Sequence, residues 1–509
     1  MQRLNKWTIL LGSFPATFIL GLDYTIVSIA LPTIQQSLAA TFIQTQWIIN
    51  IFMLMLCILM ASMGRLGDIV GSLKMLNIGW LLLALGSLLA GLSNDPLWLI
   101  VWRGLQGVAI AIIVPNNIAL LSHSFVEKEA GFAMGWWMSI LAIGFALGPV
   151  IGGFMCHFFS WRSIFYINIP FVLASAAIGL FVMKSPQNLD REKSYIDWRG
   201  MILLALSVGS LVLLVIEGPQ IGWLSWPILV LLGVSVLSFW LLYRIEVKLE
   251  QPLIHFSYFK NPLFSACVLT NFSLLVFLIS AFFLLPFYLH VVRQDTTVMS
   301  GLILLPITLV MALVSPVAGR MATSPRPAVP ILIGVICILI AAIVMTQFST
   351  DTNLVTLLLA FVPFGIAWGF VFSATAPIAI GALPANSAGI ATGMLWGIQN
   401  IGAALGLAVT GTVFRLLEKH NLLLQIKQAG LETTKLFEKY INSMLMNPER
   451  VDYSAAGVSV QLHTQVVEMF DRSFAQAFQS VMWGLVVFTF LLLVAVALLL
   501  LKAQRSHAF

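Results

Sequence analysis

The sequence predicts an all-α polytopic membrane protein with fourteen transmembrane helices, arranged as two related six-helix bundles plus two extra central helices. Three observations predict this fold class: the composition, the lengths of the apolar blocks and an internal repeat. The 509 residues are 60% hydrophobic and 9% charged, with a mean hydropathy of +0.99, whereas soluble domains carry about 25% charged residues. A single soluble core is therefore excluded. The net charge of +6 needs no nucleic-acid partner, because loop topology accounts for it.

The apolar residues fall in blocks of roughly 18–25 residues, about the length that a helix needs to cross a bilayer. The predicted spans are, in order, 7–31, 44–63, 75–93, 97–121, 131–155, 163–183, 198–216, 226–243, 264–288, 299–319, 329–347, 354–375, 388–413 and 479–501. The first block contains Asp23 and no small-residue cleavage site follows it. It is therefore interpreted as a span and not as a signal peptide.

The distribution of Lys and Arg tests this count, because cytoplasmic loops carry an excess of both. With the N-terminus inside, the short outer loops hold only Arg162 and Arg293. The inner segments hold Arg3, Lys6, Arg65, Lys74, Lys128, Lys184, Arg191, Lys193, Arg199, Arg244, Lys248, Lys260, Arg320, Arg326, Lys502 and Arg505. Because one missed span would invert every later loop, this asymmetry supports fourteen spans with both termini in the cytoplasm.

An internal repeat places the two extra spans. Residues 130–153 match 388–411 at eleven positions when shifted by 258 residues, and five of these matches are glycines. Small residues at helical spacing let membrane helices approach closely. The repeat relates the fifth span to the thirteenth, which is an offset of eight spans. Two six-span halves without an insertion would give an offset of six spans. The two extra spans therefore lie between the halves, most simply at 198–216 and 226–243.

The resulting organisation has five parts. Residues 1–183 form an N-terminal six-helix bundle, and 184–250 hold the two inserted helices with flanking loops. Residues 251–413 form the first five helices of the C-terminal bundle, and 414–478 form an extracytoplasmic loop. Residues 479–509 form the last transmembrane helix and a short cytoplasmic tail. In the loop, apolar residues recur at helical spacing, which predicts short amphipathic helices on the outer surface.

Five motifs now carry a family resemblance. Gly144-xxx-Gly148-Pro149-xx-Gly152-Gly153 resembles the antiporter motif in the fifth helix of major facilitator superfamily exporters. The other four are, in chain order, Leu22-Asp23 through Pro32, Gly64-xx-Gly67-Asp68-xx-Gly71-xx-Lys74, Arg103-xx-Gln106-Gly107, and Trp161-Arg162 through Pro170. Together they resemble the fourteen-span drug:proton antiporter family of the EmrB/QacA type. The resemblance implies the major facilitator fold and export driven by protons.

One departure concerns the loop motif after the second span. Family members usually carry a basic residue after the motif Asp and a basic pair after its last Gly, whereas this chain has Ile69, Ser72 and Leu73. We expect Gly64, Asp68, Gly71 and Lys74 to act in conformational change through a simplified charge relay. Asp68 is expected to cap or pin the inner-face loop.

Two ionisable residues lie well inside predicted spans, Asp23 and Arg103. A charge at that depth costs several kcal/mol by insertion scales, so it usually faces the interior and has a role. A carboxylate can change charge during a transport cycle, because burial raises its pKa and a nearby cation lowers it. Arg103 stays charged, so it cannot carry the proton but can hold Asp23 ionised. The alternative is a purely structural pair. Glu217, at the outer end of the span 198–216, has two interpretations: it binds a second proton or a cation, or it is a solvated residue at a helix end.

Polar amides and aromatic residues inside spans are the candidates for a substrate cavity. Amides in lipid usually bond to a neighbouring helix, and aromatic residues either pack or form a wall for a flat or cationic ligand. The candidates are Asn50, Asn116, Asn117, Trp136, Asn271, Trp396, Gln399 and Asn400. We expect Gly144, Gly148, Pro149, Gly152 and Gly153 to let their helix bend and pack against the partner half.

These features predict a proton-coupled exporter of small amphipathic molecules in the bacterial inner membrane, working by alternating access. The alternatives are a dedicated exporter of a siderophore or metabolite and a non-transporting sensor. The seven histidines lie in or near loops without metal-ligand spacing, and no phosphate-binding loop is present, so an enzyme, a cofactor or a metal is not expected. The expected partners are the substrate, protons and the lipid bilayer, and the loop 414–478 either docks a periplasmic adaptor or is a connecting cover.

Overall fold

The computed structural model describes residues 6–125, 128–183, 197–249, 252, 254–322, 324, 326–383, 388–429, 431, 441 and 460–505. The described residues form helices and contain no strand. The helices of the first half are α1 (Lys6–Leu38), α2 (Phe42–Val70), α3 (Ser72–Gly91), α4 (Pro96–Ser124), α5 (Lys128–Phe158), α6 (Ser163–Tyr166) and α7 (Asn168–Met183). The remaining elements are α8 (Trp198–Ile221), α9 (Trp226–Glu246), η1 (Phe256–Lys260), α10 (Pro262–Phe287), η2 (Tyr288–Val292), α11 (Thr297–Ala322), α12 (Ala328–Met345), α13 (Leu354–Gly381), α14 (Ala388–Gln428) and α16 (Val460–Arg505).

Each predicted span corresponds to a helix of this structure. Among the described residues, thirteen helices are long and apolar enough to cross a membrane. The remaining predicted span, the sixth in the chain at 163–183, consists of the short α6 and the 16-residue apolar α7. Helix α7 packs on α1 and α3. The fold is therefore the predicted all-α membrane fold.

Polar residues at the ends of the apolar blocks fix where several helices begin. Thr41 and Gln44 form a reciprocal capping box at the start of α2, with N–O distances of 3.2 and 2.9 Å. The side chains of Asp95, Asn261 and Asn353 accept hydrogen bonds from backbone amides in the first turns of α4, α10 and α13. Such caps satisfy N–H groups that have no partner inside the helix.

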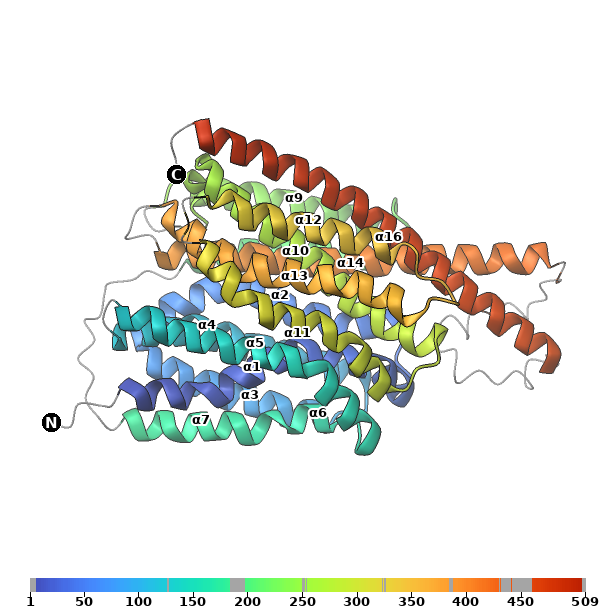
Figure 1. The fold of residues 1–509 in the computed structure, drawn as a ribbon, viewed down its shortest axis with the longest axis horizontal. Helices are drawn as coiled ribbons and strands as arrows, with labels where there is room; N and C mark the ends of the chain where they lie inside the picture. The colour runs from blue at the N-terminus through green and yellow to red at the C-terminus, as the bar shows by residue number, and fades with distance from the viewer. Residues whose placement is uncertain are drawn as a thin grey trace.

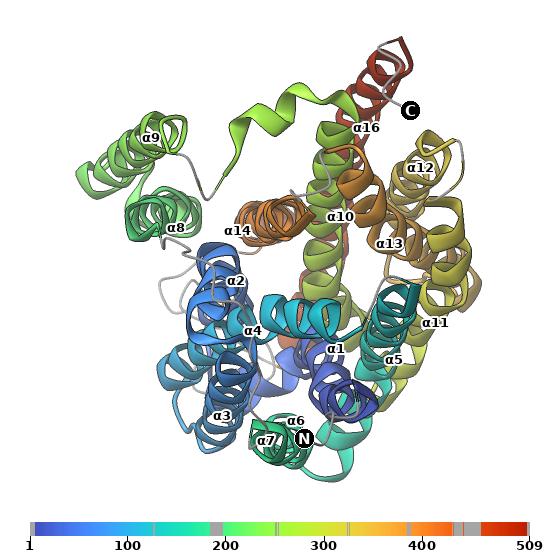
Figure 2. The same ribbon diagram turned by 90° about the vertical axis from the view of Figure 1, so that its left-hand side faces the viewer.

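The helices form two bundles that lie side by side (Figures 1 and 2). The first comprises α1 to α7 and the second α10 to α16, and they meet where α2 packs on α14 and where α5 packs on α11. We call the end of the molecule with Trp7 and Arg505 the terminal end. The opposite end, with Phe42 and Phe287, is called the loop end.

The inserted helices α8 and α9 lie between the halves in sequence but at the edge of the molecule in space (Figure 2). They pack on each other, and α8 also packs on α2 and α14. Many apolar side chains of α9 are exposed, including Trp226, Leu237 and Trp240, as expected for a surface that faces lipid. The insertion therefore leaves the contact between the two halves intact.

The expected short helices of the segment 414–478 are replaced, where the structure describes it, by continuations of two spans. Helix α14 runs 41 residues to Gln428 and α16 runs 46 residues from Val460, and both project beyond the bundle at the loop end (Figure 1). A small apolar cluster that includes Leu422 and Phe470 joins them. Helical structure is thus confirmed for the apolar residues that lead into the last span, but α14 continues beyond the predicted end at 413 and α16 begins before the predicted start at 479. Most of 430–459 lies outside the described residues.

Candidate functional site

The centre of the first bundle holds an ion pair between Asp23 on α1 and Arg103 on α4. Arg103 Nη1 donates to Asp23 Oδ2 at 2.8 Å, and the side chains of Arg103 and Asp23 are 2% and 0% exposed. The sequence named both residues but left open whether they touch. The structure brings them together because α4, which starts at the loop end, runs beside α1 and places Arg103 level with the middle of α1.

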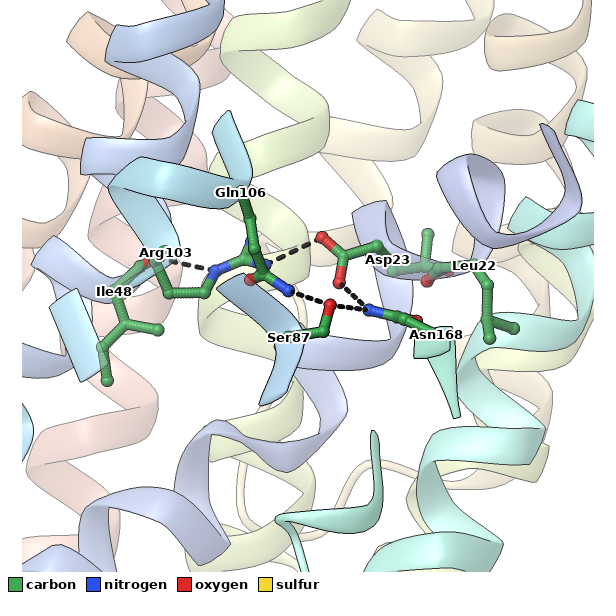
Figure 3. A network of polar contacts seen from close by, with 8 residues as sticks. Leu22, Asp23, Ile48, Ser87, Arg103, Gln106 and Asn168 are labelled. Atoms are coloured by element: carbon green, nitrogen blue, oxygen red, sulfur yellow. Dashed lines mark hydrogen bonds and ion pairs between the residues drawn. The ribbon is translucent and has the colours of Figure 1, made fainter. Parts of the chain in front are cut away.

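Three polar side chains from α3, α4 and α7 extend the ion pair into a closed network (Figure 3). Arg103 Nη1 also donates to Gln106 Oε1 at 2.8 Å, and Gln106 Nε2 donates to Ser87 Oγ at 2.8 Å. Asn168 Nδ2 donates to Ser87 Oγ at 3.1 Å and to Asp23 Oδ1 at 3.3 Å. Both carboxylate oxygens of Asp23 therefore accept hydrogen bonds, which is the arrangement that an ionised carboxylate favours.

Two further contacts hold the Arg103 side chain. Its Nε donates to the Ile48 carbonyl at 3.3 Å, and its guanidinium carbon lies 4.3 Å from the ring centroid of Phe52. Removing one partner of a buried ion pair leaves the other charge uncompensated, which is costly. If Asp23 took up a proton, Arg103 would lose its counter-ion and retain Gln106, a backbone carbonyl and an aromatic face. Protonation of Asp23 would thus weaken a contact that joins α1 to α4.

An aromatic chain leads from this ion pair to the second bundle. Phe52 contacts Tyr24, with ring centroids 5.7 Å apart, and Tyr24 contacts Phe145 at 5.5 Å. Phe145 in turn contacts Trp368 at 5.1 Å and Phe372 at 5.8 Å, both on α13. The rings of α1, α2 and α5 therefore meet those of α13 between the two bundles.

The predicted cavity residue Trp396 joins this chain from α14. Its ring centroid lies 5.6 Å from that of Phe372, and Trp396 is buried. Trp136 lies elsewhere on α5 and is 47% exposed. The structure thus brings Trp396, but not Trp136, to the aromatic contact between the halves.

Three of the predicted cavity amides use their NH2 groups within the helix packing. Asn116 donates to the Met63 carbonyl on α2 at 3.0 Å, and Asn271 donates to Thr375 Oγ1 on α13 at 2.6 Å. Asn400 donates to a carbonyl of its own helix at 2.8 Å. The bonds of Asn116 and Asn271 correspond to the alternative of a bond to a neighbouring helix, whereas the bond of Asn400 stays within α14.

The other three predicted amides are also buried. The side-chain N and O atoms of Asn50 and Asn117 have no hydrogen-bond partner among the described residues, and both residues are 0% exposed. Gln399 is 4% exposed. An unpartnered buried amide costs free energy, so Asn50 and Asn117 are the amides with the greatest capacity for a new hydrogen bond.

The predicted loop motif lies where α2 ends and α3 begins at the terminal end. Gly71 has a φ of +109°, a conformation that glycine adopts readily, and it separates the two helices. A methyl group on Gly64 would lie 3.1 Å from Pro115 Cβ on α4. Lys74 is exposed, and the side chain of Asp68 lies outside the described residues. Arg65 Nη2 donates to the Pro252 carbonyl at 2.5 Å and so ties α2 to the linker that follows α9.

The glycines of α5 pack mainly within their own half, which corrects the expectation that they face the partner half. A methyl group at Gly144 would meet the Phe18 carbonyl of α1, one at Gly148 would meet Thr25, and one at Gly152 would lie 2.8 Å from Ile26. The cause is that α5 lies along α1 over most of its length.

Among the glycines of this stretch, Gly153 at the loop end is the one whose added methyl group would meet the second bundle. A methyl group at Gly153 would lie 2.6 Å from the Thr297 carbonyl of α11, and one at Gly301 would meet the Pro149 carbonyl. By contrast, Gly319 and Gly397, which lie nearer the terminal end, have open space around the position of a Cβ. The halves are thus in backbone contact toward the loop end.

The repeated glycines of α14 make equivalent contacts. Methyl groups at Gly402 and Gly406 would lie 2.9 and 2.8 Å from Phe272 and Val276 of α10, within the second bundle. One at Gly411 would lie 2.7 Å from the Gln46 side chain of α2, in the first bundle. Helix α14 therefore packs on α10 and α2 as α5 packs on α1 and α11, and the sequence repeat corresponds to a structural one.

Comparisons with known proteins agree with this architecture. The model of the Major Facilitator Superfamily matches residues 13–407. Multidrug resistance protein Stp of Mycobacterium tuberculosis is 31% identical over 397 residues, which cover 78% of this chain and 73% of the relative. The tetracenomycin C resistance and export protein of Streptomyces glaucescens is 30% identical over 411 residues, 81% of this chain and 76% of the relative. A bacterial homologue of the human lysosomal transporter Spinster, in an inward-facing and unoccupied conformation, has a similar fold, with a TM-score of 0.67, 13% identity and 99% of both chains covered.

Proposed function

The chain belongs to the major facilitator superfamily, and on this basis we propose that it is a proton-coupled secondary active exporter of small amphipathic or hydrophobic molecules. Its relatives include proteins named for multidrug resistance and for antibiotic export, which supports multidrug efflux as the transport class. No catalytic chemistry and no cofactor form part of this proposal, and the proton is the coupling ion.

The proposed location is the bacterial cytoplasmic membrane, with both termini in the cytoplasm. The support for this orientation is the excess of Lys and Arg in the segments that would face the cytoplasm. In this orientation the loop end faces outward. The described conformation, with the halves in contact toward the loop end, is then the inward-facing state of an alternating-access cycle.

The observation that carries the proposal is the buried ion pair of Asp23 and Arg103. Its carboxylate is the acidic group at the centre of the first bundle and accepts hydrogen bonds from Arg103 and Asn168. A proton arriving from outside would neutralise Asp23, release Arg103 from its counter-ion and favour substrate release. Return to the inward-facing state would discharge the proton to the cytoplasm and restore the pair at 2.8 Å.

The proposed substrate region is the aromatic contact between the halves, next to this ion pair. Phe145, Trp368, Phe372 and Trp396 present ring faces on which a flat molecule can stack. Asn50 and Asn117 retain unpartnered amide groups. A molecule with an apolar ring system and a few polar groups matches these residues.

A dedicated exporter of a single siderophore or metabolite is the second candidate. The observation that favours it is a relative named for one compound, the tetracenomycin C resistance and export protein. The projecting ends of α14 and α16 have two proposed roles. They dock a periplasmic adaptor protein, or they only connect the two spans and cover the outer surface.

The test is transport in proteoliposomes with an imposed proton gradient, with a lipophilic cation, a siderophore and riboflavin as separate cargoes. We expect Asp23→Asn to abolish gradient-driven efflux while leaving a folded protein that still exchanges substrate without a gradient. The matched control is Asp351→Asn, since Asp351 is an exposed carboxylate at the loop end. Full coupled efflux by Asp23→Asn would refute the coupling role. A wild-type protein that binds these compounds but moves none of them would favour a sensor.

A further inference from the structure

A second buried carboxyl lies outside the network of Asp23. Among the described residues, the acidic side chains that are at least nine-tenths buried are Asp23, Asp197, Glu246 and Glu418. Asp197 and Glu246 accept backbone hydrogen bonds at 2.8 and 3.1 Å, and Asp23 is paired with Arg103. Glu418 is 5% exposed, and its carboxyl makes no hydrogen bond or ion pair with the described residues. A carboxylate in such a place is strongly disfavoured relative to the neutral acid.

Glu418 lies at the loop end, where three separate parts of the chain meet. Arg415 precedes it by one turn of α14, and its guanidinium carbon lies 5.9 Å from the ring centroid of Phe42 at the start of α2. The Phe42 ring stacks on Phe414 at 5.7 Å. Helix α8 reaches the same place, because Thr412 of α14 donates to the Val215 carbonyl at 2.9 Å. Burial lowers the pKa of Arg415, and the carboxyls of Glu418 and Glu217 oppose this. The first half, the insert and the second half therefore all contribute to this contact.

The charges of this contact do not balance if both acids are ionised. One cation, Arg415, faces two carboxyls. Glu217 is half-buried and retains some access to water, whereas Glu418 is buried. One carboxylate suffices to neutralise Arg415, so the buried Glu418 is the acid that holds a proton when the contact is closed.

No other element supplies a closer cation. Helices α10 and α13 contain no acidic or basic residue, and α2 contains none before Arg65. On α14 itself, Lys419 and His420 are exposed.

The charged residues of α16 and of the η2 segment also lie apart from Glu418. Gln425, two turns beyond Glu418, bonds Ser473 of α16 at 3.0 Å, so the acidic and basic residues of α16 at this end lie still nearer its tip. They are His463, Glu468, Asp471 and Arg472. After η2, which carries His290, Arg293 is paired with Asp295 at 3.0 Å.

We propose that Glu418 is a second proton-binding group, which takes up a proton from the extracytoplasmic side when α2, α8 and α14 close the loop end. When these helices part, water reaches the carboxyl and the O–H bond breaks again, with the proton returned to the same side. The group therefore does not add to the protons carried across the membrane. It makes external acid favour the inward-facing state, in which Asp23 can discharge its own proton. The sidedness of this inference rests on the proposed function.

The test measures the conformation and needs no substrate. Spin labels at Phe159→Cys and Leu354→Cys, two exposed positions at the loop ends of different halves, report closure in a variant whose four native cysteines are alanine. As the pH falls from 8.5 to 5.5, the ratio of closed to open molecules should rise in the labelled protein that keeps Glu418. Linkage to one proton allows a rise of up to about tenfold per pH unit. Glu418→Gln should stay closed across this range, and Glu418→Asp should keep a pH response.

The matched control is Asp95→Asn, which replaces an exposed acid at the loop end by a residue that also caps a helix and should respond to pH as the wild-type protein does. A Glu418→Gln variant with the unchanged pH response would overturn the proposal, as would a wild-type protein with none. In proteoliposomes, Glu418→Gln should keep the proton-to-substrate ratio of the wild type, whereas Asp23→Asn abolishes coupling. If the wild-type protein moves no substrate, the proposed function fails, while the label distances still decide the role of Glu418.

Discussion

Breaking the ion pair of Asp23 and Arg103 should be far more damaging than removing both charges together. At an N–O distance of 2.8 Å, and with an effective dielectric constant of about 20, two unit charges attract by about 6 kcal/mol. Desolvation of the two charges offsets much of this. Either single change, Asp23→Asn or Arg103→Gln, leaves an uncompensated buried group and should cost about 3–5 kcal/mol. In the double variant neither charge remains, so its loss should fall well below the sum of the two single losses.

The assay is a double-mutant cycle of unfolding in mixed micelles, followed by tryptophan fluorescence and combined with efflux in proteoliposomes. The double variant should regain stability but not gradient-driven efflux, because no group at the site can then change charge. The control cycle uses Arg293 and Asp295, a half-buried pair at 3.0 Å near the surface, whose coupling should be about 0–1 kcal/mol. Losses for Asp23 and Arg103 that add within about 0.5 kcal/mol would refute the interaction. Coupled efflux by the double variant would show that the pair is structural.

Three further predictions concern helix contacts and one loop. Gly148→Ala should lower the free energy of unfolding by about 1–3 kcal/mol in the same assay, because its methyl group would enter the interface with α1. The control Gly397→Ala, where the added methyl group meets open space, should be neutral within about 0.5 kcal/mol. Equal losses for the two variants would contradict the packing argument. Gln46→Met removes bonds of 2.8 and 3.3 Å to two carbonyls of α14 and should lower the closed fraction of the spin-labelled protein several-fold; an unchanged fraction would show that these bonds do not hold the loop end. Burial and the nearby charge of Arg65 lower the pKa of His255, so the stability that neutral His255 contributes is present above its ordinary pKa and lost as pH falls through the lowered value. Arg65→Gln should raise that pKa in an NMR titration, and no rise would exclude the influence of Arg65.

Hydropathy and the repeat sufficed to predict the architecture. Each apolar block became a helix because a bilayer leaves few other ways to satisfy a backbone. The glycine matches at Gly144/Gly402 and Gly148/Gly406 identified equivalent helices because close approach admits little but glycine at those positions. What the glycines contact could not be predicted, since a stripe of small residues does not say which neighbour it faces. The expectation that they face the other half was therefore wrong for all but the loop-end residues.

The polar sites were only partly predictable. Asp23 and Arg103 are conspicuous as charges in apolar blocks, but their contact depends on how α1 and α4 are rotated. Asn168 was visible only as one letter of a motif, and Ser87 carried no signal at all. Glu418 was missed because Arg415 and Glu418 themselves ended the apolar block, which placed them in a predicted loop. The Arg-Leu-Leu-Glu spacing, which puts both groups on one helix face, was the available signal.

The two halves share their packing but not their chemistry. The pairing of α5 with α1 is repeated by α14 with α10, so α10 and α13 are the counterparts of α1 and α4. Where α1 and α4 carry the ion pair of Asp23 and Arg103, α10 and α13 contain no acidic or basic residue. They meet instead through uncharged side chains: the ring centroids of Phe277 and Phe364 lie 4.9 Å apart, and Asn271 donates to Thr375 Oγ1 at 2.6 Å. Closure of the two halves thus sets the ion pair of α1 and α4 against counterpart helices, α10 and α13, that carry no charged residue. A change of charge at Asp23 then alters the first half, which contacts the second half through α1, α2 and α5. The aromatic chain through Phe145 is one of those contacts, and it connects the proposed proton site to the proposed substrate region.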